Sequence, residues 1–149
     1  MNRKLIAIGN VLMGDDGIAV AIAIQLAEQL RQRNIEVILG ETDIGYCISS
    51  IQEGDYLILL DAAHCNKQPG EISILPLQDY MGGFDRSSPH DMSILKLLCS
   101  YYPCATGMLL AVEIAKEGFG YGLSVQLQSK IPEISDAILE IIDKLPDME

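Results

Sequence analysis

LIAIGNVLMGDDG, residues 5–17, decides the fold of this chain. Residues 4–9 form a short, continuous apolar run, which is typical of a strand buried on both faces of a sheet. The segment 17–33 follows, and its apolar residues recur at a spacing of four, which predicts an amphipathic helix. These residues are Ile18, Ile22, Leu26 and Leu30. A buried strand that leads directly into such a helix indicates a parallel sheet covered by helices.

The loop between this strand and this helix lies where nucleotide-binding proteins hold a phosphate. Its glycines Gly9 and Gly14 match the start of a P-loop, but Asp15 and Asp16 replace the Lys and the Ser or Thr that should follow. The loop does not match G-x-G-x-x-G either. A phosphate bound here would meet two carboxylates at close range. The loop therefore suits a cation better than a phosphate.

The rest of the chain continues the alternation of strands and helices. Buried strands are predicted at 35–39, 56–60 and 107–114, an edge strand at 71–77, a polar loop at 78–89, and helical segments at 48–52, 91–101 and 124–145, the last kinked or split by Pro132. The pattern predicts one domain, residues 1–149, with a mostly parallel five-stranded sheet between helices.

Ligands of such sheets bind beyond the carboxyl ends of the strands. Asp16 follows the first strand, Asp61 ends the third, and His90 precedes the helix that leads to the strand at 107–114. We therefore expect these three residues to gather at one edge of the sheet.

Composition excludes several classes of function. The 149 residues carry 10 Lys and Arg against 21 Asp and Glu, a formal charge of −11, which repels nucleic acid. No window approaches the ~18 apolar residues of a membrane span, and the apolar run near the N-terminus is too short for a secretory signal. The four cysteines form no C-x-x-C pair and indicate reduced thiols of a cytoplasmic protein. We expect a monomer.

Asp15 and Asp16 have two interpretations. An acidic residue at the start of a helix caps its free N–H groups and suits the helix dipole. That accounts for one of the two, since only one residue can be the N-cap. We interpret Asp16 as the functional carboxylate, and Asp15 stays open between the two roles.

Asp61 and His90 are the other candidate ligands. Asp61 follows five apolar residues, so its carboxylate lies at the edge of the core, where burial disfavours the charge unless a cation or donors compensate it. The alternative is an Asx turn that closes the strand. His90, in Ser88-Pro89-His90-Asp91, has the alternative of a helix-start residue without further role. Two carboxylates and an imidazole suit nickel, zinc or manganese.

Other residues of this region are weaker candidates. His64, in a polar turn, is interpreted as a solvated loop residue, and Glu41 and Asp43 either add acid to the same edge or lie in a solvated loop. The chain has no H-E-x-x-H, no G-x-S-x-G and no pair of histidines on one helix face. Three of its cysteines lie in or beside hydrophobic segments, Cys65 being the exception, and they are interpreted as inert.

Three blocks of this sequence resemble the signatures of the [NiFe]-hydrogenase maturation endopeptidases. The blocks lie at residues 9–18, 59–62 and 88–91, and Gly122-Leu123-Ser124 resembles a weaker fourth. Their order and spacing agree with the family over nearly the whole chain. The resemblance implies a flavodoxin-like α/β/α sandwich and a nickel-dependent endopeptidase that removes the C-terminal extension of a hydrogenase large-subunit precursor.

The resemblance also implies roles for three residues. An acidic residue at the position of Asp16, an Asp at that of Asp61 and a His at that of His90 contact the metal in this family, and the nickel is carried by the precursor. From their chemistry, we expect either Asp16 or Asp61 to serve as the general base. The chain departs from the family at Ala19, Ile114 and Val125 and in the loop 40–45. Two alternatives are a metal-binding maturation chaperone without catalysis and a flavodoxin-like module that binds a small ligand.

Overall fold

The computed structural model describes residues 2–79 and 93–146, and a five-stranded sheet forms its centre. The strands lie in the order β2 (Ile35–Glu41), β1 (Arg3–Ile8), β3 (Tyr56–Ala63), β5 (Thr106–Glu113) and β4 (Ile72–Pro76). The first four are parallel, and β4 pairs antiparallel with β5 at the edge. The predicted mostly parallel sheet with an edge strand after the third strand is confirmed.

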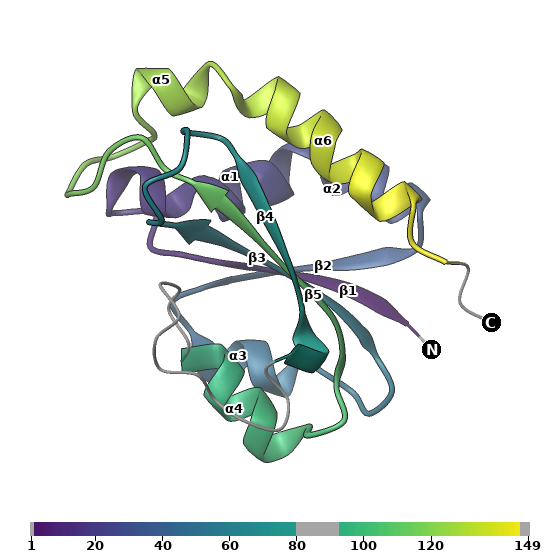
Figure 1. The fold of residues 1–149 in the computed structure, drawn as a ribbon. Helices are drawn as coiled ribbons and strands as arrows, with labels where there is room; N and C mark the ends of the chain where they lie inside the picture. The colour runs from purple at the N-terminus through teal and green to yellow at the C-terminus, as the bar shows by residue number, and fades with distance from the viewer. Residues whose placement is uncertain (1, 80–92, 147–149) are drawn as a thin grey trace.

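Helices cover both faces of the sheet, as Figure 1 shows. One face carries α1 (Ile18–Gln25), α2 (Ala27–Gln32), α5 (Val125–Gln128) and α6 (Ile131–Asp143), and the other carries α3 (Ile44–Ser49) and α4 (Ser93–Tyr101). Two short 3₁₀ turns, η1 (Gly14–Gly17) and η2 (Leu77–Asp79), follow β1 and β4. The result is the flavodoxin-like three-layer arrangement.

Each face of the sheet has its own hydrophobic core. The larger core lies under α1, α2 and α6, and all four apolar positions of the predicted first helix are buried in it: Ile18, Ile22, Leu26 and Leu30. The smaller core lies under α3 and α4. Strand β1 contributes Leu5 to the first core and Ile6 to the second, as expected for a strand covered on both faces.

Several element boundaries differ from the prediction. The helix expected over 17–33 is two helices that meet at Leu26. The turn expected at 48–52 is α3, which begins earlier because the Asp43 carboxylate caps it by accepting the Tyr46 N–H at 2.9 Å. Pro132 lies in the first turn of α6, where a missing N–H costs nothing, so it splits the C-terminal helix rather than kinking it.

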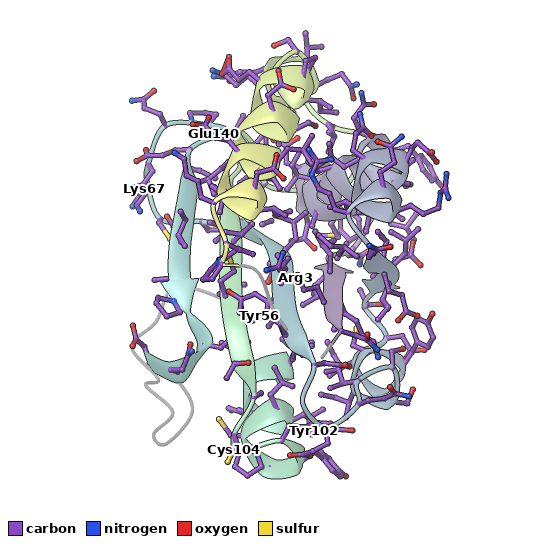
Figure 2. The ribbon with its side chains drawn as sticks, turned by 90° about the vertical axis from the view of Figure 1, so that its right-hand side faces the viewer. Arg3, Tyr56, Lys67, Tyr102, Cys104 and Glu140 are labelled. Carbon is purple, nitrogen blue, oxygen red and sulfur yellow. The ribbon has the colours of Figure 1, made fainter. Side chains whose placement is uncertain are left out.

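The amino ends of the parallel strands hold a buried ion pair. At the amino ends of the parallel strands the buried Lys4 ammonium lies 2.8 Å from the Asp55 carboxylate and donates to the Ser50 carbonyl at 2.7 Å. Figure 2 views the molecule from the side that holds the termini, where Arg3 and Tyr56 lie next to each other in neighbouring strands. Burial raises the pKa of Tyr56.

Nowhere in residues 2–79 and 93–146 is a helix long and apolar enough to cross a membrane.

Candidate functional site

The connections of the sheet create a crevice at the carboxyl ends of β1 and β3. From β1 the chain passes to β2 on one side, and from β2 it crosses to β3 on the other side, so the strand order reverses at this point. Such a switch point is where open α/β sheets bind their ligands. A pocket of about 260 Å³ lies there, and its lining includes Asn10, Asp16, Glu41, Asp61 and His64.

Asp16 lies on η1, the 3₁₀ turn that follows β1. Its Oδ2 accepts the Asn10 N–H at 2.7 Å. Gly9 permits this approach, because a Cβ at Gly9 would lie 2.1 Å from the Asp16 carbonyl oxygen and its φ is +143°. None of the ion pairs between described residues involves Asp16. A backbone N–H therefore holds its carboxylate, which has no lysine or arginine partner within residues 2–79 and 93–146.

Asp15 has a different role from its neighbour. Its side chain is 1% exposed and accepts four hydrogen bonds, from the N–H groups of Ala115, Lys116 and Ser124 and from the Ser124 hydroxyl, at 2.7–3.1 Å. No side-chain hydrogen bond caps either η1 or α1. The helix-cap interpretation is therefore wrong, because Asp15 binds a loop a hundred residues further along the chain.

Asp61 lies inside β3 and not at its end. The strand continues to Ala63 because Asp61, Ala62 and Ala63 pair in register with β5. The alternative of a turn that closes the strand is therefore wrong. Asp61 is 7% exposed, its Oδ1 accepts the Ala62 N–H at 2.8 Å, and the residue lines the same pocket as Asp16. Two carboxylates, one on the 3₁₀ turn after β1 and one in β3, thus line the same pocket at the switch point.

The third predicted ligand, His90, lies outside the described residues, and so does most of the loop predicted at 78–89. Within residues 2–79 and 93–146, no three His, Cys, Asp or Glu side chains form a group that could hold a metal. Asp16 and Asp61 alone therefore do not make a complete metal site with the described residues.

His64 belongs to this edge, although the sequence indicated only a solvated loop residue. It is exposed, as predicted for a loop residue, but it also lines the pocket of Asp16 and Asp61, and its Nδ1 lies 2.7 Å from Glu117 Oε1. The extension of β3 to Ala63 brings it there. A signal was present in the sequence: His64 follows Asp61 by three residues, directly after the strand.

The two acidic residues at the end of β2 and just after it divide between the two interpretations. Glu41 lines the pocket and has a positive φ of 51°, a conformation that favours glycine. Asp43 is the cap of α3 and does not line the pocket. One of the two thus adds negative charge at the site, and the other is structural.

The cysteines are not placed for nucleophilic catalysis. All four are free, and neither a cysteine nor a serine is among the described residues that line the pocket of Asp16. Burial raises the pKa of the Cys47 thiol to about 11, which suppresses the thiolate at neutral pH. The chemistry that the described residues support is that of carboxylates acting on a cation or a water molecule.

Fold and site together define a small α/β protein with an acidic switch-point pocket, and comparisons place it among known proteins. The model of the hydrogenase maturation protease family, HycI, matches residues 20–141. None of the curated proteins compared with the chain matches it. The family match covers most of the chain, which belongs to the hydrogenase maturation protease family and is a protease.

Solved structures agree with this fold. The hydrogenase maturating endopeptidase HybD from E. coli superposes with a TM-score of 0.73 at 21% identity, over 97% of this chain and 93% of that chain. The [NiFe] hydrogenase maturation protease HybD from Thermococcus kodakarensis gives a TM-score of 0.70 at 19% identity, over 95% and 99%. A solution structure of an endopeptidase from Escherichia coli gives 0.71 at 22%, over 94% and 91%.

Proposed function

We propose that this protein is the endopeptidase that removes the C-terminal extension from the large-subunit precursor of a [NiFe] hydrogenase, and that the precursor brings the nickel. One observation carries the proposal: Asp16 and Asp61, which are far apart in the sequence, line one pocket at the switch point. An edge with carboxylates, where no lysine or arginine of residues 2–79 and 93–146 pairs with Asp16, suits a substrate that arrives with a bound cation.

The proposed mechanism assigns binding and proton transfer to the same carboxylates. Asp16 and Asp61, with His90 as the third contact, hold the precursor's nickel, so that the scissile bond beyond it lies beside a carboxylate. Positioning of this kind supplies much of a rate enhancement. One carboxylate takes a proton from a water molecule, the water oxygen attacks the scissile carbonyl carbon, and the leaving amine takes up the proton when the C–N bond breaks. Asp16 and Asp61 are both candidates for this base.

The family membership and the pocket support a protease over the two alternatives. The carboxylate that follows Gly14 and Asp15 disfavours a nucleotide or flavin phosphate at the helix start. We also propose that the protein acts as a monomeric single domain in the cytoplasm, which suits its four free cysteines.

The test is the mass of the hydrogenase large subunit before and after incubation with this protein. Nickel-loaded precursor is expected to be shortened, and nickel-free precursor is expected to stay intact. Inhibitors directed at serine or cysteine proteases are expected to leave the reaction unchanged, because no such side chain among the described residues lines the pocket. Binding of the precursor without shortening would replace the protease by the chaperone alternative, and tight FMN or nucleotide binding would favour the ligand-binding module.

A further inference from the structure

The three most exposed large apolar side chains of the described residues lie between the end of β5 and the start of α5. Tyr121 is 93% exposed, Phe119 90% and Val125 86%, and all three lie within the seven-residue stretch 119–125. Leu12, in the loop after β1, is also exposed. Other exposed apolar residues of the described chain, such as Ile24 and Tyr101, lie singly on α1 and α4. Aromatic side chains grouped in this way are typical of a protein interface.

The loop that carries these side chains is tied to the loop after β1. Gly14 N–H donates to the Gly120 carbonyl at 3.0 Å, Gly120 N–H donates to the Leu12 carbonyl at 3.3 Å, and Met13 forms a β-bridge with Gly120. Figure 1 shows the green loop between β5 and α5 beside the purple start of the α1 segment. We call residues 11–13 and 117–125 the docking loops.

Asp15 anchors both ends of the second docking loop. Its buried carboxylate binds Ala115 and Lys116 at the start of the loop and Ser124 at its end. Between these anchors the backbone passes through Gly118, Gly120 and Gly122, all at positive φ. The aromatic side chains between the glycines are thus presented to solvent by a fixed backbone, although burying them would be favourable.

The docking loops border a pocket that also reaches Asp16. A second pocket, of about 500 Å³, is lined by Met13, Asp16, His64, Ile114, Glu117 and Gly118. It shares Asp16 and His64 with the pocket that Asp61 lines. A polypeptide that reaches Asp16 from this side therefore passes directly over Met13 and Gly118.

We infer that the docking loops bind the body of the substrate protein, through Phe119, Tyr121, Val125 and Leu12, and so align its scissile segment with Asp16. This inference rests on the proposed function. The occupant is the nickel-loaded precursor, by means of a surface with apolar side chains at its centre and basic side chains beside them. Charge complementarity supports this choice, because the adjoining pocket is lined by Asp16 and Glu117 and the whole chain carries a formal charge of −11.

The experiment compares two double variants that remove equal numbers of exposed apolar side chains. Phe119→Ser with Tyr121→Ser changes the docking loops, and Ile24→Ser with Tyr101→Ser changes exposed residues elsewhere. All four side chains are exposed, so both variants are expected to keep the melting temperature of the wild type to within a few degrees. Binding and cleavage of the nickel-loaded precursor from the same organism are measured separately, by calorimetry on Asp16→Asn backgrounds and by the mass of the large subunit.

The docking variant is expected to raise Kd and KM at least about tenfold, with kcat unchanged, because aromatic residues at the centre of an interface contribute most of its affinity. The control variant is expected to change neither. A docking variant with the Kd and KM of the wild type would overturn the inference and leave the protease intact. An otherwise unaltered chain that binds the precursor through these residues but does not shorten it would overturn the protease and leave the docking surface. A chain that does not bind the precursor at all would overturn both.

The salt dependence tests the charged part of the inference. The Kd between the precursor and the protein with unaltered docking loops is expected to rise between about 50 and 500 mM NaCl. Salt screens the attraction between charges of opposite sign. A Kd that stays constant or falls would show that basic side chains of the precursor do not face this edge.

Discussion

The two ends of the sheet hold their aspartates in opposite ways. At the amino ends of the strands, Asp55 is neutralised by Lys4 at 2.8 Å and also accepts the Gln52 N–H at 2.8 Å. At the carboxyl ends, the Asp16 carboxylate accepts the Asn10 N–H and pairs with no lysine or arginine of the described residues, and Asp61 lines the same pocket. The aspartate at the first end is paired inside the protein, whereas we propose that the carboxylates at the second end act on a cation carried by the substrate.

This contrast separates the cost of a mutation to stability from its cost to activity. A carboxylate whose charge is compensated inside the protein contributes to folding, and removing its partner leaves an isolated buried charge. A carboxylate held only by a backbone N–H loses little on conversion to an amide, because the amide oxygen accepts the same hydrogen bond. Each of the following predictions tests one side of this difference.

The largest effect is expected at the pocket that Asp16 and Asp61 line. Asp16→Asn and Asp61→Asn are each expected to lower the rate of precursor cleavage by roughly 10²–10⁴, the range that a general base contributes. At position 16 the amide oxygen can still accept the Asn10 N–H, so the melting temperature of Asp16→Asn should change by only a few degrees. Cleavage rate is followed by mass spectrometry and unfolding by circular dichroism. Loss of folding in parallel with loss of activity would assign both residues a structural role.

The opposite result is expected at the amino ends of the strands. Lys4→Met leaves the buried Asp55 without its cation and is expected to lower the free energy of unfolding by about 3–5 kcal/mol, with kcat of the folded fraction unchanged. The matched control is Lys4→Met with Asp55→Asn, which removes both charges and should recover part of the loss. Urea titrations measure the three free energies. Equal stability of Lys4→Met and the unaltered protein would contradict the account of this end.

A smaller loss of stability is expected at Asp15, whose role lies between these extremes. Asp15→Asn places an amide NH₂ where N–H or O–H donors of the loop now point, and we expect it to lower the free energy of unfolding by about 2 kcal/mol. Because Asp15 anchors the second docking loop, KM should rise while kcat is kept. Ser124→Ala, which loses one of the four hydrogen bonds and the cap of α5, should give a milder form of the same change. A lower kcat with unchanged KM would place Asp15 in the catalytic step instead.

The smallest effect concerns two thiols at opposite ends of the sheet. Cys104, labelled in Figure 2, is exposed beside Asp55, whereas Cys47 is buried beside Gly40, with its pKa raised to about 11 by burial. Iodoacetamide at pH 8 is therefore expected to modify Cys104 well before Cys47, without loss of cleavage. Peptide mass mapping identifies the modified residue. Rapid modification of Cys47 that stops cleavage would reveal a nucleophile that the structure does not indicate.

Much of the fold was predictable because it depends on local patterns. The apolar run of β1 and the spacing of Ile18, Ile22 and Leu26 specify a buried strand and a helix covering it, and strand alternation specifies the parallel sheet. The meeting of Asp16 and Asp61 followed from the same topology, since parallel strands end at one edge. The role of these two residues, like that of His90, stays a prediction.

The rest could not be predicted because it depends on contacts between distant segments. Nothing near Asp15 reveals that its partners are Ala115 and Ser124, a hundred residues away. The length of β3 is set by pairing with β5, which continues past the buried charge of Asp61 and carries His64 to the pocket. Sequence patterns identify which residues are unusual, but long-range pairing decides which of them face the site.

The most direct test incubates nickel-loaded large-subunit precursor with the unaltered protein and with the double variant Asp16→Asn, Asp61→Asn. The mass of the large subunit is then measured by mass spectrometry. The unaltered protein should shorten the nickel-loaded precursor and leave nickel-free precursor intact. The folded double variant should leave both at full mass. Complete shortening by the double variant, or of the nickel-free precursor, would contradict the claim that this acidic pocket acts on a nickel-bearing substrate.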